Sequence, residues 1–243
     1  MARIRLDQLV LARGLAESRE KAQRLILGGK ILSNGRPLTK PGQSIDDSAD
    51  LRLLEPERYV SRGGEKLEAA LNYWKIDLRG AICVDIGAST GGFTDCMLQH
   101  GAIRVYAVDV GRALLHPRLA ADPRVVVMDE VNARYLTPDM IPESPAFVAI
   151  DASFISLTIL LPPVRRLLGS GARMVTLIKP QFEVGRAEVG RGGVVRSPSA
   201  RQRAIERVRA AGEQAGLRWE GVIESPLLGP AGNKEFLAYW TVP

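Results

Sequence analysis

The sequence predicts an α/β protein in which a mostly parallel sheet, covered by helices on both faces, follows a small α+β domain. Three observations lead to this fold class. From residue 81 onward, apolar strand-like runs alternate with helical patterns, which is typical of a parallel sheet. The last two apolar runs are joined by a connection that fits a hairpin better than a helical crossover, so the final strand is expected to be antiparallel. The first 40 residues have a pattern of their own and hold the chain's excess positive charge.

The N-terminal segment predicts two short helices followed by strands. Leu6, Leu9 and Val10 fall on one face of a helix that Gly14 can end, and Ser18 can cap a second helix. The run KILSNGRPL then predicts two strands around an Asn-Gly turn, and DLRLL predicts a closing strand.

The net charge of +6 comes from this segment. Lys and Arg number 9 in the first 40 residues against 3 Asp and Glu, and the remaining residues carry 24 of each sign. A localised basic surface is typical of a nucleic-acid partner, although a solvated charged face has the same composition. The helix, turn and charge pattern resembles the S4 RNA-binding domain, which implies recognition of folded RNA by shape and phosphate contacts. The candidate RNA-binding residues are Arg3, Arg5, Arg13, Arg19, Lys21, Arg24, Lys30 and Arg62; a basic helical cap without RNA is the alternative.

The chain is predicted to consist of three segments. Residues 1–55 are expected to form the small domain, residues 56–61 a linker, and residues 62–243 the larger domain. A helical pattern begins directly after the linker and places Lys66 near the first turn of its helix. A mostly parallel sheet that ends in an antiparallel hairpin is the Rossmann-like arrangement of class I methyltransferases, as distinct from the all-parallel NAD-binding fold.

A glycine-rich loop follows the first strand of the larger domain. Open sheets bind ligands at this position, because glycine lets the backbone approach them closely. The dinucleotide fingerprint is not met, since its second glycine falls on Ser89, and no phosphate-binding Lys-Ser/Thr pattern is present. Acidic residues end the next two strands: Asp109 is placed to accept ribose hydroxyls and Asp129 to meet an adenine amino group.

A ligand with ribose and adenine but no pyrophosphate points to S-adenosyl-L-methionine. Asp85 has two interpretations, since it could contact the cofactor or hold the loop through backbone N–H groups. The candidate cofactor-binding residues are Asp85, Gly87, Ala88, Ser89, Thr90, Gly91, Gly92, Phe93, Thr94, Asp109 and Asp129.

Two further strands end in charged residues, Asp151 and Lys179. In a parallel sheet both reach the same edge, where an isolated charge is costly unless it is paired. Lys66 from the first helix and Glu235 from the final hairpin are candidates for the same cleft. At these positions the motifs SRGGEKL, DIGASTGGFTDC, DASFISL, LIKPQFE and GNKEFL resemble the haemolysin A (TlyA) family within the FtsJ-like RNA 2′-O-methyltransferases.

That resemblance implies a Lys-Asp-Lys-Glu catalytic tetrad, which carries over to Lys66, Asp151, Lys179 and Glu235. Methyl transfer from a sulfonium needs an attacking 2′-oxygen held in line and relieved of its proton. Lys179 is the candidate base, since a nearby ammonium or partial burial favours a neutral amine. Asp151 would orient it and favour the sulfonium charge, while Lys66 and Glu235 would hold the ribose and each other. Taken alone, Lys179 could equally be a surface lysine at a strand end.

The remaining expectations concern partners and location. The resemblance implies ribosomal RNA or ribosomal subunits as partner, with cytidine as the modified nucleotide, and no obligate protein partner is evident. The Gly-rich basic segment EVGRGGVVRSPSARQR is expected to be a mobile loop that closes over RNA or a disordered connection. The two cysteines show no metal or disulfide spacing, no signal peptide is recognised, and residues 146–164 are broken by polar residues and prolines. A cytoplasmic enzyme without a metal is therefore expected; a membrane-active haemolysin and a non-catalytic ribosome-assembly factor are the alternatives.

Overall fold

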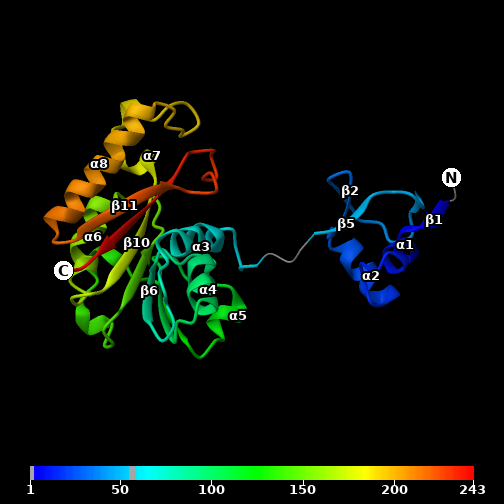
Figure 1. The fold of residues 1–243 in the computed structure, drawn as a ribbon, viewed down its shortest axis with the longest axis horizontal. Helices are drawn as coiled ribbons and strands as arrows, with labels where there is room; N and C mark the ends of the chain where they lie inside the picture. The colour runs from blue at the N-terminus through cyan, green and yellow to red at the C-terminus, as the bar shows by residue number, and fades with distance from the viewer. Residues whose placement is uncertain (1–2, 55–57) are drawn as a thin grey trace. The chain divides into compact units, whose positions relative to one another are not determined.

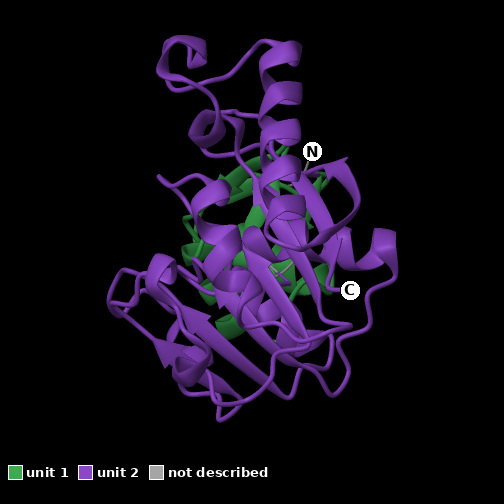
Figure 2. Cartoon of the chain, turned by 90° about the vertical axis from the view of Figure 1, so that its left-hand side faces the viewer, with its two compact units in different colours: residues 1–57 green, residues 58–243 purple. Residues whose placement is uncertain are grey.

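The computed structural model describes residues 3–54 and 58–243, which belong to two compact units, residues 1–57 and residues 58–243. Figure 1 shows the elements of each unit along the chain, and Figure 2 gives the two units different colours. Each unit has its own hydrophobic core and is described by itself.

The first unit contains the two predicted helices and the predicted Asn-Gly hairpin. Ser18 accepts a hydrogen bond from the Lys21 N–H and so caps the second helix, while Gly14 follows the first helix with a φ of +69°. Leu6, Val10 and residues of the second helix form the core. The bounds are β1 Arg3–Arg5, α1 Leu6–Ala12, α2 Arg19–Leu27, β2 Ile31–Ser33, β3 Arg36–Leu38, β4 Ser44–Asp46 and β5 Leu51–Leu53.

The strands of this unit form two small antiparallel sheets. One has the order β3-β2-β5, in which the predicted hairpin and the predicted closing strand pair. The other pairs β1 with β4, an element that the sequence analysis did not include. This pairing fixes the chain ahead of α1, because Ile4 lies opposite Ile45.

The second unit is built on a seven-stranded sheet with the order β11-β12-β10-β9-β6-β7-β8. The five strands from β10 to β8 pair in parallel, and β12 runs antiparallel to both of its neighbours. The predicted fold class and the antiparallel last strand are therefore confirmed. The bounds are β6 Ile82–Ile86, β7 Arg104–Val108, β8 Val125–Met128, β9 Phe147–Ile150, β10 Arg173–Ile178, β11 Arg218–Glu224 and β12 Phe236–Thr241.

Helices cover both faces of this sheet (Figure 1). On one face α6 and α8 bury their apolar sides in a core with β6, β9 and β10, and on the other face α3, α4 and α5 do so. The helices are α3 Gly63–Trp74, α4 Gly92–Gln99, α5 Pro117–Ala120, α6 Leu157–Arg165, α7 Pro180–Glu183 and α8 Pro198–Gln214, with 3₁₀ turns η1 Ala133–Tyr135, η2 Pro138–Met140 and η3 Arg186–Glu188.

The apolar stretch at residues 146–164 is divided between two elements. It contains the buried strand β9 and most of α6, which Ser156 caps by accepting a hydrogen bond from the Thr158 N–H. Within residues 3–54 and 58–243, the structure has no helix that is both long and apolar enough to cross a membrane.

Candidate active site

The site lies where β6, β7, β9 and β10 end, because parallel strands bring their carboxyl ends to one edge of the sheet. The loop from Gly87 to Gly91 connects β6 to α4 at this edge. Gly87 has a φ of +82°, and a Cβ there would lie 2.7 Å from the Asp151 carbonyl oxygen. Only glycine therefore lets the loop pass this close to the end of β9.

Three cavities open along this edge and share residues. The Gly-loop cavity, of about 270 Å³, lies between the glycine-rich loop and the segment Ser61–Gly63. The Asp109 cavity, of about 550 Å³, extends from Gly87 past Asp109 to Asn132. The Glu235 cavity, of about 460 Å³, lies on the side of β12.

Asp109 is the acid that lines the second of these cavities. One of its carboxylate oxygens accepts a hydrogen bond from the Ser89 N–H at 2.8 Å, and the other accepts one from the Gly111 N–H at 2.8 Å. Each carboxylate oxygen has a second acceptor direction. The carboxylate can therefore hold its own loops in place and still accept two hydroxyl groups from a ligand.

Asp85 and Asp129, in contrast to Asp109, line none of these three cavities. Asp85 is buried and accepts a hydrogen bond from the Thr94 hydroxyl at 2.6 Å. Burial raises the pKa of Asp85 to about 7, because desolvation penalises its charged form. Asp129 accepts a hydrogen bond from the Ala113 N–H at 2.8 Å and so supports the loop that carries Leu114 to the Asp109 cavity. Asp85 therefore contacts Thr94 on α4 and lines none of the three cavities, and its contact with the cofactor stays a prediction.

The other candidate cofactor residues lie around the loop. Gly87 and Ser89 line both the Gly-loop cavity and the Asp109 cavity, and Ala88, Thr90, Gly92 and Phe93 line the former. Gly91 has a φ of +95°, and a Cβ there would lie 2.4 Å from a Leu119 methyl carbon. This glycine serves the packing of the loop against α5.

The four candidate catalytic residues meet in two ion pairs. Lys66 Nζ on α3 lies 2.6 Å from Glu235 Oε2, directly before β12, and both side chains are buried. Lys179 Nζ at the end of β10 lies 2.7 Å from Asp151 Oδ1 at the end of β9. The charges therefore balance within the cluster, and burial in a shared cleft makes each partner dependent on the other.

All four residues line the Glu235 cavity, and all except Glu235 also line the Gly-loop cavity. Asp151 and Ser153 line all three cavities. The lysine-carboxylate cluster and the Asp109 cavity therefore adjoin each other at Asp151 and Ser153, in the segment that follows β9.

Two residues of that chain were missed by the sequence analysis. Ser153 accepts a hydrogen bond from Lys179 Nζ at 2.8 Å, which gives the ammonium group a second partner besides Asp151. Phe154 is 92% exposed, has a φ of +64°, and lies 5.3 Å from the Phe182 ring between centroids. A bulky residue with positive φ and an exposed ring is unusual and indicates a functional surface.

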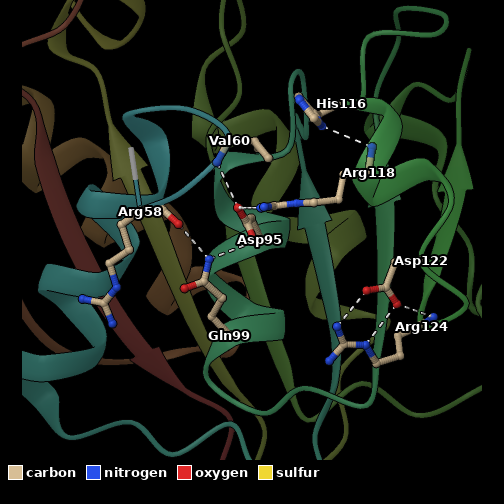
Figure 3. A network of polar contacts seen from close by, with 8 residues as sticks. All are labelled: Arg58, Val60, Asp95, Gln99, His116, Arg118, Asp122 and Arg124. Carbon is tan, nitrogen blue, oxygen red and sulfur yellow. Dashed lines mark hydrogen bonds and ion pairs between the residues drawn. The ribbon is translucent and has the colours of Figure 1, made fainter. Parts of the chain in front are cut away.

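A network of polar contacts around Asp95 holds the first residues of the second unit, including Arg58 and Val60 (Figure 3). Buried Asp95 on α4 accepts hydrogen bonds from the Val60 N–H at 2.9 Å and from Arg118 at 2.7 Å. The Gln99 amide also donates to Asp95 and to the Arg58 carbonyl. These bonds fix the segment that places Ser61 and the candidate RNA-binding residue Arg62 in the wall of the Gly-loop cavity.

In the first unit, a buried acid organises part of the predicted RNA-binding set. Asp7 is fully buried and accepts hydrogen bonds from Arg5, Arg19 and Gln23, each at 3.0 Å. These bonds, led by that of Arg5, hold the pKa of Asp7 well below its usual range. The arginines themselves are exposed.

The other candidate cations of this unit are more dispersed. Arg3 and Arg13 donate to the backbone carbonyls of Ser44 and Asp47. Lys21 and Lys30 line a groove with apolar residues of α2 and β5, and Arg24 is exposed on α2. Arg5 and Arg19 therefore share Asp7 as a hydrogen-bond partner. Among the described residues of this unit, the other candidate cations form no hydrogen bond with Asp7.

Comparison with known proteins gives two family matches. The FtsJ-like methyltransferase family matches residues 59–241, and the S4 domain matches residues 4–51. The chain is 48% identical to the Bacillus subtilis protein named "Putative rRNA methyltransferase YqxC", over 97% of this chain and 84% of that protein. It is 44% identical to the Mycobacterium tuberculosis 16S/23S rRNA (cytidine-2′-O)-methyltransferase TlyA, over 98% of this chain and 89% of that protein.

A solved structure described as "Putative hemolysin from Streptococcus thermophilus" is 45% identical, with a TM-score of 0.76, over 100% of this chain and 89% of that one. These findings confirm the predicted resemblance, and family membership confirms the predicted S-adenosylmethionine-dependent methyltransferase class. The chain belongs to the FtsJ-like methyltransferase family and has an S4 domain ahead of its methyltransferase domain.

Proposed function

We propose that this protein transfers a methyl group from S-adenosylmethionine to a ribose 2′-hydroxyl of ribosomal RNA, with cytidine as the modified nucleotide. One observation carries the proposal: the Asp109 cavity and the lysine-carboxylate cluster meet at Asp151 and Ser153. A cofactor in the first space and a hydroxyl in the second would be in the close, fixed geometry that a one-step transfer needs.

The residues around the Asp109 cavity suit the cofactor. Asp109 has two free acceptor directions for the hydroxyls of its ribose, and Val131, Asn132 and Ala133 line the part beyond for its adenine. The Gly-loop cavity and Asp151 supply polar groups for the amino-acid portion. When bound, S-adenosylmethionine supplies an electrophilic methyl group on a sulfonium centre.

Lys179 is the base in this proposal. Its Nζ has one contact with Asp151 and one with Ser153, so a third direction is left for the substrate hydroxyl. As a neutral amine it would take the 2′-hydroxyl proton while the new O–CH3 bond forms and the S–CH3 bond of the cofactor breaks, which leaves S-adenosylhomocysteine. The proton would then pass from Lys179 to solvent. The Asp151 carboxylate, whose Oδ1 lies 2.7 Å from Nζ, then pairs with the ammonium that results.

Lys66 and Glu235 have a positioning role here. Glu235 is only 1% exposed, and its Oε2 holds Lys66 in the wall of the cleft. This ion pair fixes the position of the Lys66 ammonium, which can then donate a hydrogen bond to an oxygen of the substrate ribose.

Features outside the cluster support RNA as the substrate. The first unit is an S4 domain and carries the exposed Arg5 and Arg19. Phe154 offers an exposed ring beside the cleft, and an aromatic ring of this kind stacks on a nucleotide turned out of its helix. The choice of ribosomal RNA and cytidine rests on the name of the Mycobacterium tuberculosis relative.

The test uses radiolabelled S-adenosylmethionine and ribosomal subunits that lack the modification. We expect label in ribosomal RNA, recovered after alkaline hydrolysis as a resistant dinucleotide, since a 2′-O-methyl group blocks cleavage at the adjacent phosphate. Label in alkali-sensitive nucleotides would exclude the ribose as acceptor. RNA binding without any label would instead support the assembly-factor alternative.

A further inference from the structure

The segment between α7 and α8, residues 184–197, is attached to the rest of the second unit rather than detached from it. It contains the 3₁₀ turn η3 and a tight bridge in which the Gly190 N–H donates to the Val194 carbonyl at 3.1 Å. In Figure 1 this yellow segment and the orange-red connection between β11 and β12 lie at the same end of the sheet. The sequence predicts a mobile loop or a disordered connection at residues 188–203, but residues 198–203 belong to α8.

Asn233 on the β11–β12 connection joins these two segments. Its side-chain amide donates to the Gly193 carbonyl at 2.8 Å, and its side-chain oxygen accepts from the Val195 N–H at 2.9 Å. Its own backbone carbonyl accepts from the Gly229 N–H at 2.8 Å, and the residue is 1% exposed. Both ends of one buried amide are therefore used to hold the backbone of the bridge, two residues before Glu235.

Helix α8 provides a second attachment. The Arg201 guanidinium donates to the carbonyls of Val195 at 3.0 Å and Arg196 at 2.7 Å. Arg203 forms an ion pair with Glu188 and so neutralises the one carboxylate of the segment. These bonds hold the backbone of the segment and so fix the positions from which its exposed side chains extend.

The segment is also a wall of the reaction site. Val189 and Gly193 line the Glu235 cavity together with Asn233, Lys66 and Lys179. RNA whose ribose reaches the lysines through the Glu235 cavity therefore lies close to this segment.

Three exposed arginines lie on it: Arg186, Arg191 and Arg196. In the ranges 3–54 and 58–243, no carboxylate forms an ion pair with them. Guanidinium groups on a backbone that is held next to the cleft can reach phosphate oxygens of a bound RNA, and phosphate contacts dominate nucleic-acid affinity.

We propose that residues 184–197 form a fixed phosphate-binding wall of the catalytic cleft, in which Arg186, Arg191 and Arg196 contact the RNA backbone next to the modified nucleotide and Asn233 positions them. This inference rests on the proposed RNA methyltransferase function. Such contacts hold the substrate equally before and during the reaction, so their removal should raise KM for RNA and leave kcat unchanged.

The first experiment compares the full-length wild type with a variant in which all three arginines become alanine. Its matched control is Arg79→Ala, since Arg79 is exposed and precedes the amino end of β6, away from the cleft. Binding to transcribed small- and large-subunit ribosomal RNA is measured across salt concentrations. Each phosphate contact contributes about 0.7 to 0.9 to the magnitude of the slope of log affinity against log salt, so this magnitude should fall by about 2 to 3 in the triple variant. The control should match the wild type.

The second experiment tests Asn233 as a positioning residue. Asn233→Ala should raise KM for RNA and lower the salt slope while leaving S-adenosylmethionine binding, measured by calorimetry without RNA, unchanged. Added to the triple arginine variant it should cause little further loss, because both changes remove the same contacts. Thermal unfolding of each variant identifies a folding defect, and the triple arginine variant, which alters only exposed side chains, keeps the inference testable in that case.

Two results separate this inference from the proposed function. If the wild type methylates RNA and the triple variant has wild-type KM and salt slope, the phosphate-binding wall is refuted. An Asn233→Ala effect on RNA that simply adds to that of the arginines would refute its positioning role. If the wild type transfers no methyl group to RNA, the proposed function fails, whereas the salt dependence of RNA binding still reports on the arginines.

Discussion

The buried pair of Lys66 and Glu235 makes a stability prediction that does not depend on activity. The two side chains are 11% and 1% exposed, and their charged atoms lie 2.6 Å apart. Removal of one partner of a buried ion pair leaves an uncompensated charge, which costs about 3 to 5 kcal/mol. Glu235→Ala leaves Lys66 beside a cavity that water can enter, so we expect a loss of about 3 kcal/mol. Lys66→Ala leaves the deeper carboxylate unpaired and should cost more.

A double-mutant cycle measures the pair itself. The Lys66→Ala, Glu235→Ala double variant should lose at least about 1 kcal/mol less than the sum of the single variants, because neither charge is left alone. Urea unfolding followed by tryptophan fluorescence suits this test, since Trp74, Trp219 and Trp240 are the chain's three tryptophans and all belong to the second unit. Additive losses would mean that the pair is not formed in solution, and the arrangement of the cleft would have to be revised.

Other predictions concern single side chains around the cleft. Burial raises the pKa of Asp85 in the folded protein to about 7, well above its ordinary value, so its stabilising contribution is complete below about pH 4 and is lost as the pH rises through 7. Asp85→Asn should remove this loss and raise the free energy of unfolding at pH 8 by a few kcal/mol. If urea unfolding gave the same difference between variant and wild type at pH 5 and at pH 8, this prediction would be contradicted. A Cβ at Gly229 would lie 2.4 Å from Glu235 Oε1, so Gly229→Ala should displace Glu235 and lower kcat, while unaltered kinetics would show that the carboxylate tolerates the shift. Phe154→Ala should reduce methylation of RNA at least about tenfold through loss of stacking, with Phe154→Tyr retaining activity; a Phe154→Ala enzyme as active as wild type would exclude the ring from substrate binding.

Part of the site could be predicted because the physics of parallel sheets is simple. Asp151 and Lys179 end the neighbouring strands β9 and β10, and adjacent parallel strands bring their last residues together. Lys66 and Glu235 are 169 positions apart, on a helix and after a hairpin. No periodicity relates them, so the sequence offers them only as candidates for the same cleft, and the family resemblance supplies their place in the tetrad.

Other features depend on contacts that a single sequence does not encode in a readable pattern. Asn233 looks like an ordinary turn residue, and its role follows from a segment 40 positions away in the chain. The exposure and positive φ of Phe154 result from the turn after β9. The direction of the Asp85 side chain was left open, because an acid next to a glycine-rich loop can face the ligand or the core. The short pair β1–β4 lacks enough residues for a strand signal.

The central claim is that Lys179 removes the proton from a ribose hydroxyl beside the cofactor. Single-turnover methyl transfer, with RNA and S-adenosylmethionine both saturating, tests it most directly by comparing the wild type with Lys179→Ala and with the control Lys75→Ala at the far end of α3. A positioned base contributes about 100-fold to 10,000-fold, so the Lys179→Ala rate should fall by at least 100-fold while the control stays at the wild-type rate and both variants still bind the cofactor. A Lys179→Ala rate within a few-fold of the wild type would contradict the account.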